Sequence, residues 1–165
     1  MNRHYDNYLV RKYPLLYRDR HGDMRTTAMV WGFSCGDGWF NILDTLSAKL
    51  SYPYEEAKWR LDWLLENKPS EIEAIKEQQL RISELEENHP RAVQVKEKFG
   101  SLRFYVDGIV RPDHRAAIAF AESLSVRTCE VCGARGKQRG GGWIRTLCNT
   151  HAMESKQRSD DESSD

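Results

Sequence analysis

The stretch RTCEVCGARGKQRGGGWIRTLCNTHA, residues 127–152, decides the fold of the C-terminal part of this 165-residue chain. Within it, two residues separate Cys129 from Cys132, and two also separate Cys148 from His151. Two ligand pairs of this spacing can surround one tetrahedral zinc ion. Because four protein ligands leave no open position for water or substrate, we expect one structural Zn²⁺ and no catalytic zinc.

The residues between the two ligand pairs predict a small finger. Gly133, directly after the second cysteine, lets the backbone turn so that amide groups can point at the sulfur atoms. A hairpin across residues 140–144, followed by a helix carrying the last two ligands, would complete a treble-clef layout, which residues 127–156 resemble. The segment has few large apolar side chains, so the ion would supply much of its stability.

Charge is unevenly distributed along the chain. The 25 basic and 25 acidic residues balance, so no overall field directs the protein to nucleic acid or to an anionic membrane. Residues 127–158 nevertheless carry seven basic side chains against Glu130 and Glu154, a net charge of 7 − 2 = +5. The basic residues are Arg127, Arg135, Lys137, Arg139, Arg145, Lys156 and Arg158.

Four of these basic residues and one aromatic residue predict a partner-binding surface around the glycine-rich turn. We expect Arg135, Lys137, Arg139 and Arg145 to contact phosphates and Trp143 to stack on bases. The alternative is a solubilising basic loop with Trp143 packed on the finger. The sequence leaves both readings open.

Residues 1–126 are expected to form an α+β main domain of several helices with a small antiparallel sheet. A long charged helix over about 70–88, opened by a capping box of Ser70 and Glu73, holds six acidic and two basic residues. The acidic tail, 157–165, is expected to be disordered. The remaining patterns predict helices over 5–13, over 39–49, beginning after Pro53, and over 112–124. They also predict a strand over 27–33 and a hairpin of 93–96 with 101–106.

The glycine turn at residues 35–39 carries further candidates. Cys35 precedes a helix, and a helix N-terminus can lower the pKa of a thiol and make it a nucleophile. A small buried turn cysteine is favoured instead, because no histidine lies nearby in the sequence. Asp37 is expected to cap the following helix. A smaller possibility is that this turn helps to line a pocket for a small ligand such as a nucleotide.

Three stretches together resemble a family of small uncharacterised proteins encoded by bacteriophages and prophages. They are WGFSCGDGWFNILDTL (31–46), QVKEKFGSLRFYV (94–106) and the finger segments RTCEVCG (127–133) and GGWIRTLCNTH (141–151). The resemblance implies the four zinc ligands and an accessory role in host interaction, counter-defence or DNA metabolism. It also implies a shared motif of unknown role at Gly36, Asp37, Gly38 and Trp39. It implies no specific activity.

These observations predict a non-enzymatic zinc protein that binds a macromolecule in the cytoplasm of a bacterial host, with nucleic acid as the first candidate. The alternatives are an inhibitor of a host protein complex, a nucleotide-sequestering protein, and a homodimer through the helix at 70–88. A metal-dependent nuclease is disfavoured because no histidine or carboxylate cluster accompanies the finger. No apolar run approaches the length of a membrane span, so we expect no membrane partner.

Overall fold

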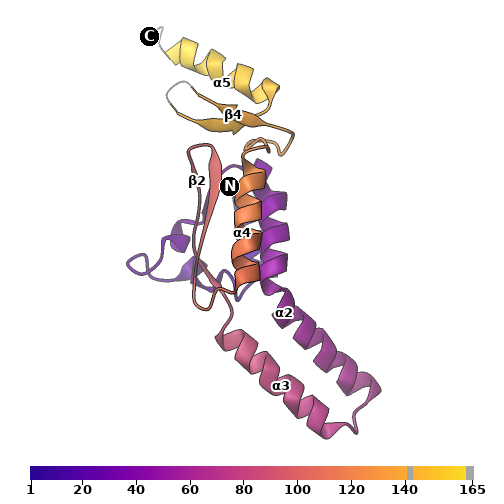
Figure 1. Ribbon diagram of the computed structural model, residues 1–165. Helices are drawn as coiled ribbons and strands as arrows, with labels where there is room; N and C mark the ends of the chain where they lie inside the picture. The colour runs from indigo at the N-terminus through magenta and orange to yellow at the C-terminus, as the bar shows by residue number, and fades with distance from the viewer. Residues whose placement is uncertain (141–142, 163–165) are drawn as a thin grey trace.

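The computed structural model describes residues 1–140 and 143–162, which form an α+β body with a finger at one end and a helical arm at the other (Figure 1). A three-stranded sheet has the order β1-β2-β3. Strand β1 (Phe33–Ser34) runs parallel to β2 (Arg91–Lys98), which pairs antiparallel with β3 (Ser101–Asp107). The expected α+β class is confirmed, although the sheet is mixed and not purely antiparallel.

The core of the body lies between this sheet and three helices, α1 (Arg3–Lys12), the first half of α2 (Phe40–Asn67) and α4 (Pro112–Ser125). Alternation along the hairpin directs Leu102 and Phe104 inward, as predicted, and α4 packs against both β3 and α2. The largest fully buried side chain of the core is Trp39, which ends the short 3₁₀ helix η3 (Asp37–Trp39).

The strand expected over 27–33 is mostly absent. The Thr27 hydroxyl accepts a hydrogen bond from the Met29 amide at 3.1 Å and starts a 3₁₀ turn, η2 (Ala28–Trp31). Gly32, with φ of +72°, ends that turn. Only Phe33 and Ser34 therefore remain extended and pair with β2, because a local hydroxyl bond competes with sheet formation here.

The two helices expected on either side of Pro53 form one continuous helix, α2. Proline lacks an N–H and usually interrupts a helix, so the sequence predicted a break. Burial of Leu50 in the body and Ala57 in the arm fixes both sides of the proline in helical geometry. Figure 1 shows α2 bending where it leaves the body, as a proline inside a helix produces.

The second half of α2 and α3 (Ile72–Glu87) form the arm, a helical hairpin that projects away from the finger (Figure 1). Leu64 and Ile75 are buried between the two helices, and the buried Gln78 side chain donates to the Ala57 carbonyl at 2.9 Å. The arm is therefore held by a small apolar seam and one buried amide bond.

The capping box expected at the start of α3 does not form. The N-cap is Glu71, which makes no side-chain capping bond, and Glu73 pairs with Lys76 at 3.0 Å instead. Ser70 lies before the N-cap because the chain is still turning through 68–71, where Lys68 and Glu71 form an ion pair at 2.7 Å.

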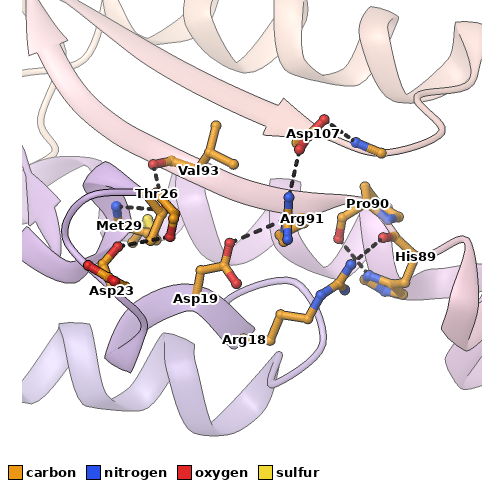
Figure 2. A network of polar contacts seen from close by, with 12 residues as sticks. Arg18, Asp19, Asp23, Thr26, Met29, His89, Pro90, Arg91, Val93 and Asp107 are labelled. Atoms are coloured by element: carbon orange, nitrogen blue, oxygen red, sulfur yellow. Dashed lines mark hydrogen bonds and ion pairs between the residues drawn. The ribbon is translucent and has the colours of Figure 1, made fainter.

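A polar network fastens the irregular N-terminal segment to the start of β2 (Figure 2). Arg91 lies between Asp19 of η1 (Arg18–His21), at 3.2 Å, and Asp107 of β3, at 2.6 Å. The Arg18 guanidinium donates to the carbonyl of His89 at 3.2 Å. These bonds hold η1 and the residues that follow it, up to 27, against the sheet.

The last helix, α5 (Asn149–Glu162), extends well into the tail for which the sequence predicted disorder from residue 157. Residues 163–165 lie outside the described part of the chain. Among the described residues, no helix combines the length and apolar character needed to cross a membrane.

Candidate metal centre and adjoining surface

The four predicted ligands converge on one point in space. The metal-binding atoms of Cys129, Cys132, Cys148 and His151 all lie within 4.8 Å of one another. The Cys148 sulfur is 3.2 Å from His151 Nδ1, the Cys129 sulfur is 3.5 Å from the same nitrogen, and the sulfurs of Cys132 and Cys148 are 4.0 Å apart. A tetrahedral ion with ordinary metal–sulfur and metal–nitrogen bonds places its ligand atoms about 3.5–3.8 Å apart. These residues therefore fit a bound metal ion.

The local fold explains how the ligands meet. The first pair lies in a knuckle at 129–133, where Gly133 (φ +76°) donates its amide to the Cys129 carbonyl at 2.9 Å. Strands β4 (Lys137–Arg139) and β5 (Arg145–Leu147) form an antiparallel hairpin. Of the second pair, Cys148 directly precedes α5 and His151 lies in its first turn. Knuckle, hairpin and helix occur in the order expected of a treble-clef-like finger.

Backbone amides prepare the sulfurs for a cation. Burial raises the pKa of the Cys129 thiol, but the amides of Cys148, Cys132 and Val131 more than offset this effect, and the pKa is lowered to about 6. The amide of His151 likewise lowers the pKa of Cys148. The thiolate forms of Cys129 and Cys148 are therefore favoured before an ion arrives. The pKa of the Cys132 thiol is instead raised, because the amide of Ala134 is outweighed by desolvation and by the neighbouring sulfur of Cys129.

The ligand histidine has an outer partner that sequence reasoning missed. His151 faces the sulfurs through Nδ1, and its Nε2 lies 3.9 Å from the carboxylate of Glu154, one turn further along α5. A carboxylate beside the second ring nitrogen holds a ligand histidine in one tautomer and orientation. The spacing of three residues on a helix was the available signal.

The glycine motif at 36–39 lies directly against the knuckle at 129–133. The Gly38 amide donates to the Glu130 carbonyl at 2.8 Å, and the Gly36 amide donates to the Glu130 carboxylate at 3.0 Å. The indole N–H of buried Trp39 donates to the Thr128 carbonyl at 2.8 Å. The turn and the knuckle therefore touch backbone to backbone.

Only glycine fits at this contact, because a Cβ atom would overlap with the main chain of the knuckle. A Cβ at Gly38 would lie 2.2 Å from the Cys129 carbonyl oxygen and 2.4 Å from the Gly133 nitrogen. A Cβ at Gly36 would lie 2.3 Å from the Glu130 carbonyl oxygen. Both glycines therefore permit the close approach of the knuckle to the body.

The other residues of the turn differ in part from expectation. Asp37 does not cap the following helix; its two carboxylate oxygens accept from the backbone amide and side chain of Asn2 at 2.6 and 2.7 Å. This partner is 35 residues away in sequence, beyond the reach of a local capping rule. Cys35 is buried, as favoured, and burial raises the pKa of its thiol to about 12, which disfavours the nucleophile.

The finger also rests on the tip of the β2-β3 hairpin. The side-chain amide of Gln138 donates to the Phe99 carbonyl at 3.0 Å, and the buried Thr146 hydroxyl donates to the Gly100 carbonyl. The Glu130 amide donates to the Thr146 carbonyl at 2.9 Å and thus joins the knuckle to the finger hairpin. Two separate turns of the body, at 36–39 and 99–100, hold the finger.

Most of the predicted partner-binding residues lie together. A groove of about 520 Å³ between the finger hairpin and α5 includes Lys137, Arg139, Trp143 and Arg145 in its lining, together with Lys156. The predicted Arg135 is exposed but does not line this groove. Of the residues in the glycine-rich turn, Gly141 and Gly142 fall outside the described part of the chain.

The groove residues differ in how firmly they are held. Arg139 donates to the side-chain oxygen of Asn149 at 2.6 Å, and Arg145 lies 3.7 Å from the Glu130 carboxylate. Lys137 has no carboxylate within ion-pairing distance among the residues the structure describes. Trp143 is 75% exposed and therefore does not pack on the finger.

The metal cluster is the one group of three or more histidine, cysteine, aspartate or glutamate side chains close enough to share an ion within residues 1–140 and 143–162. Comparison of the chain with protein-family models, with curated proteins and with solved structures gives no match.

Proposed function

We propose that this protein is a zinc-stabilised nucleic-acid-binding module whose contact surface is the groove between the finger hairpin and α5. One observation carries the proposal: four cations, Lys137, Arg139, Arg145 and Lys156, converge with the exposed ring of Trp143 on a single open groove. Cations that follow a backbone, combined with an aromatic ring that receives a base, are what sequence-tolerant nucleic-acid binding needs.

The proposed ion is Zn²⁺, and its role is structural. Three thiolates and an imidazole suit zinc among the common cellular metals, and all four positions of a tetrahedron are filled by protein. When bound, the ion crosslinks the knuckle to the first turn of α5 and so fixes the angle between hairpin and helix. That angle sets the shape of the groove.

The test is binding of labelled DNA and RNA to zinc-loaded protein across a salt series. We expect the Lys137→Ala/Arg139→Ala/Arg145→Ala variant to bind more weakly and with a shallower salt dependence. The slope of log K against log salt should decrease in magnitude by about 0.7–0.9 for each phosphate that the variant no longer neutralises.

A matched control removes three cations from the arm, as Lys58→Ala/Arg60→Ala/Lys76→Ala, and should leave both affinity and slope unchanged. Thermal melts verify that both proteins remain folded. Equal weakening by the two triple variants would mean that total charge, and not the groove, governs binding, and the proposal would fail.

A second candidate is the binding of a host protein through the arm, as an inhibitor would do. Tyr52, Trp59 and Trp63 follow one face of α2 at helical spacing and are exposed, which is unusual for large aromatic side chains in a group. Substitution of Trp59 and Trp63 by alanine should abolish capture of such a partner without affecting nucleic-acid binding. A homodimer through α3 would instead appear as a concentration-dependent mass in sedimentation.

A further inference from the structure

The tip of the β2-β3 hairpin carries an unusual residue. Phe99 and Gly100 form the two-residue turn, with φ values of +53° and +73°. Turns with two left-handed residues strongly favour Asn or Asp followed by Gly, because a bulky side chain is disfavoured in this conformation. Phe99 is the one non-glycine residue with positive φ in the described part of the chain, and its side chain is 64% exposed.

Burial does not account for a phenylalanine at this position, because the ring is mostly exposed and its cation partner is the Lys98 ammonium, 5.3 Å from the ring centroid. The finger holds the backbone of the turn through the Phe99 and Gly100 carbonyls, which accept bonds from Gln138 and Thr146. These bonds use main-chain atoms of the turn and would serve any residue at position 99. A strained backbone that presents an exposed ring is typical of a functional contact.

The ring belongs to a second groove that adjoins the first. Phe99, Trp143 and Ile144 line a groove of about 420 Å³, and Trp143 also lines the basic groove of the finger. Lys96 and Lys98 lie at its edge with no carboxylate within ion-pairing distance among the described residues. The one acidic residue there, Glu97, is bound by the Gly100 amide at 2.6 Å.

We infer that the two grooves form one path for single-stranded nucleic acid, with Phe99 and Trp143 as successive stacking platforms. This inference rests on the proposed function and narrows its substrate. The faces of exposed rings stack on the faces of bases, and in a duplex neighbouring base pairs cover those faces. Lys96 and Lys98 on one side, and the finger cations on the other, can neutralise a backbone that crosses both platforms.

The experiment compares an oligothymidine of about 12 nucleotides with a duplex of the same length, by fluorescence anisotropy of end-labelled probes. Phe99→Asn is the informative variant because it removes the ring and gives the turn its preferred Asn-Gly sequence. We expect its melting temperature to rise by about 2–4 °C while its affinity for the single strand falls by about 5-fold to 150-fold. Its salt slope should not change, since the variant keeps every cation.

Phe120→Ala is the matched control, since Phe120 is an equally exposed phenylalanine on α4, away from both grooves. It should leave single-strand affinity unchanged. A Phe99→Asn protein that melts higher and binds as tightly as the parent would overturn the inference.

Equal affinity for single strand and duplex, with both weakened by the finger triple variant, would also overturn it while leaving the proposed function intact. Absence of any binding at low salt would remove both.

Discussion

The contact between Gly38 and the metal knuckle gives the sharpest prediction about stability. In a Gly38→Ala protein, the new methyl group would meet the carbonyl of Cys129 at 2.2 Å and the amide nitrogens of Gly133 and Cys132 at 2.4 and 2.7 Å. All three atoms belong to the main chain, so no side-chain rotation relieves the clash. The knuckle and the turn must move apart.

The expected cost follows from what that movement breaks. Overpacking of this kind costs about 1–3 kcal/mol. Loss of the Gly38 amide bond to Glu130 adds about 1 kcal/mol. We therefore expect the free energy of unfolding to fall by about 2–4 kcal/mol. Gly38 does not have a positive φ, so the decrease reports the lost contact between turn and knuckle and not strain in the backbone of the turn.

The assay is urea unfolding at saturating zinc, combined with a metal competition titration against a chromogenic chelator. Metal affinity should also fall, because the displaced amides of Cys132 and Gly133 belong to the knuckle itself. Gly140→Ala is the control, since a Cβ at Gly140 meets nothing within 4 Å, and it should change stability by less than about 0.5 kcal/mol. If Gly38→Ala unfolds at the parent urea concentration with unchanged metal affinity, the docking of knuckle on turn described above is wrong.

Three further predictions concern the ion, the core and the buried histidines. Removal of zinc by a chelator, or Cys132→Ser, should unfold the finger and release one equivalent of metal; retention of full metal content by atomic emission would refute this. Trp39→Phe should cost about 1–3 kcal/mol in urea unfolding, because the partly buried Thr128 carbonyl loses its donor, whereas an unchanged midpoint would contradict that bond. Burial lowers the pKa of both His89 and His114 below 6.5, so the unfolded chain binds more protons in acid. Stability should be complete above about pH 6.5 and decrease below it, by at most about 1.4 kcal/mol per pH unit for each histidine, and the His89→Leu/His114→Leu variant should lose that part of the slope.

Sequence reasoning succeeded where the determinants are local. The ligand spacing at Cys129, Cys132, Cys148 and His151 identified the metal cluster, because a chelate geometry requires short, fixed separations in the chain. The hairpin at 91–107 and the helix at 112–125 follow from alternation and from helical periodicity in the same way.

It failed where distant parts of the chain decide the outcome. Asp37 looked like a helix cap, but Asn2 competes for its carboxylate and is brought there by the fold. Pro53 looked like a helix end, but burial on both sides keeps α2 continuous. The role of Gly36 and Gly38 depends on a knuckle more than 90 residues away in sequence. The residues around the two glycines contain no pattern that predicts this contact.

Docking of the knuckle on the turn at 36–39 links metal supply to the stability of the whole chain. An ion that binds only the folded form stabilises that form by RT ln(1 + [M]/Kd), and here the added free energy reaches the core through Trp39 and Gly38. The coupling is reciprocal: each kcal/mol by which the body favours the docked knuckle tightens ion binding by about fivefold. The finger attached to a folded body should therefore bind the ion at lower metal concentrations than the isolated finger would. Without the ion the chain loses this stabilisation and becomes more susceptible to proteolysis.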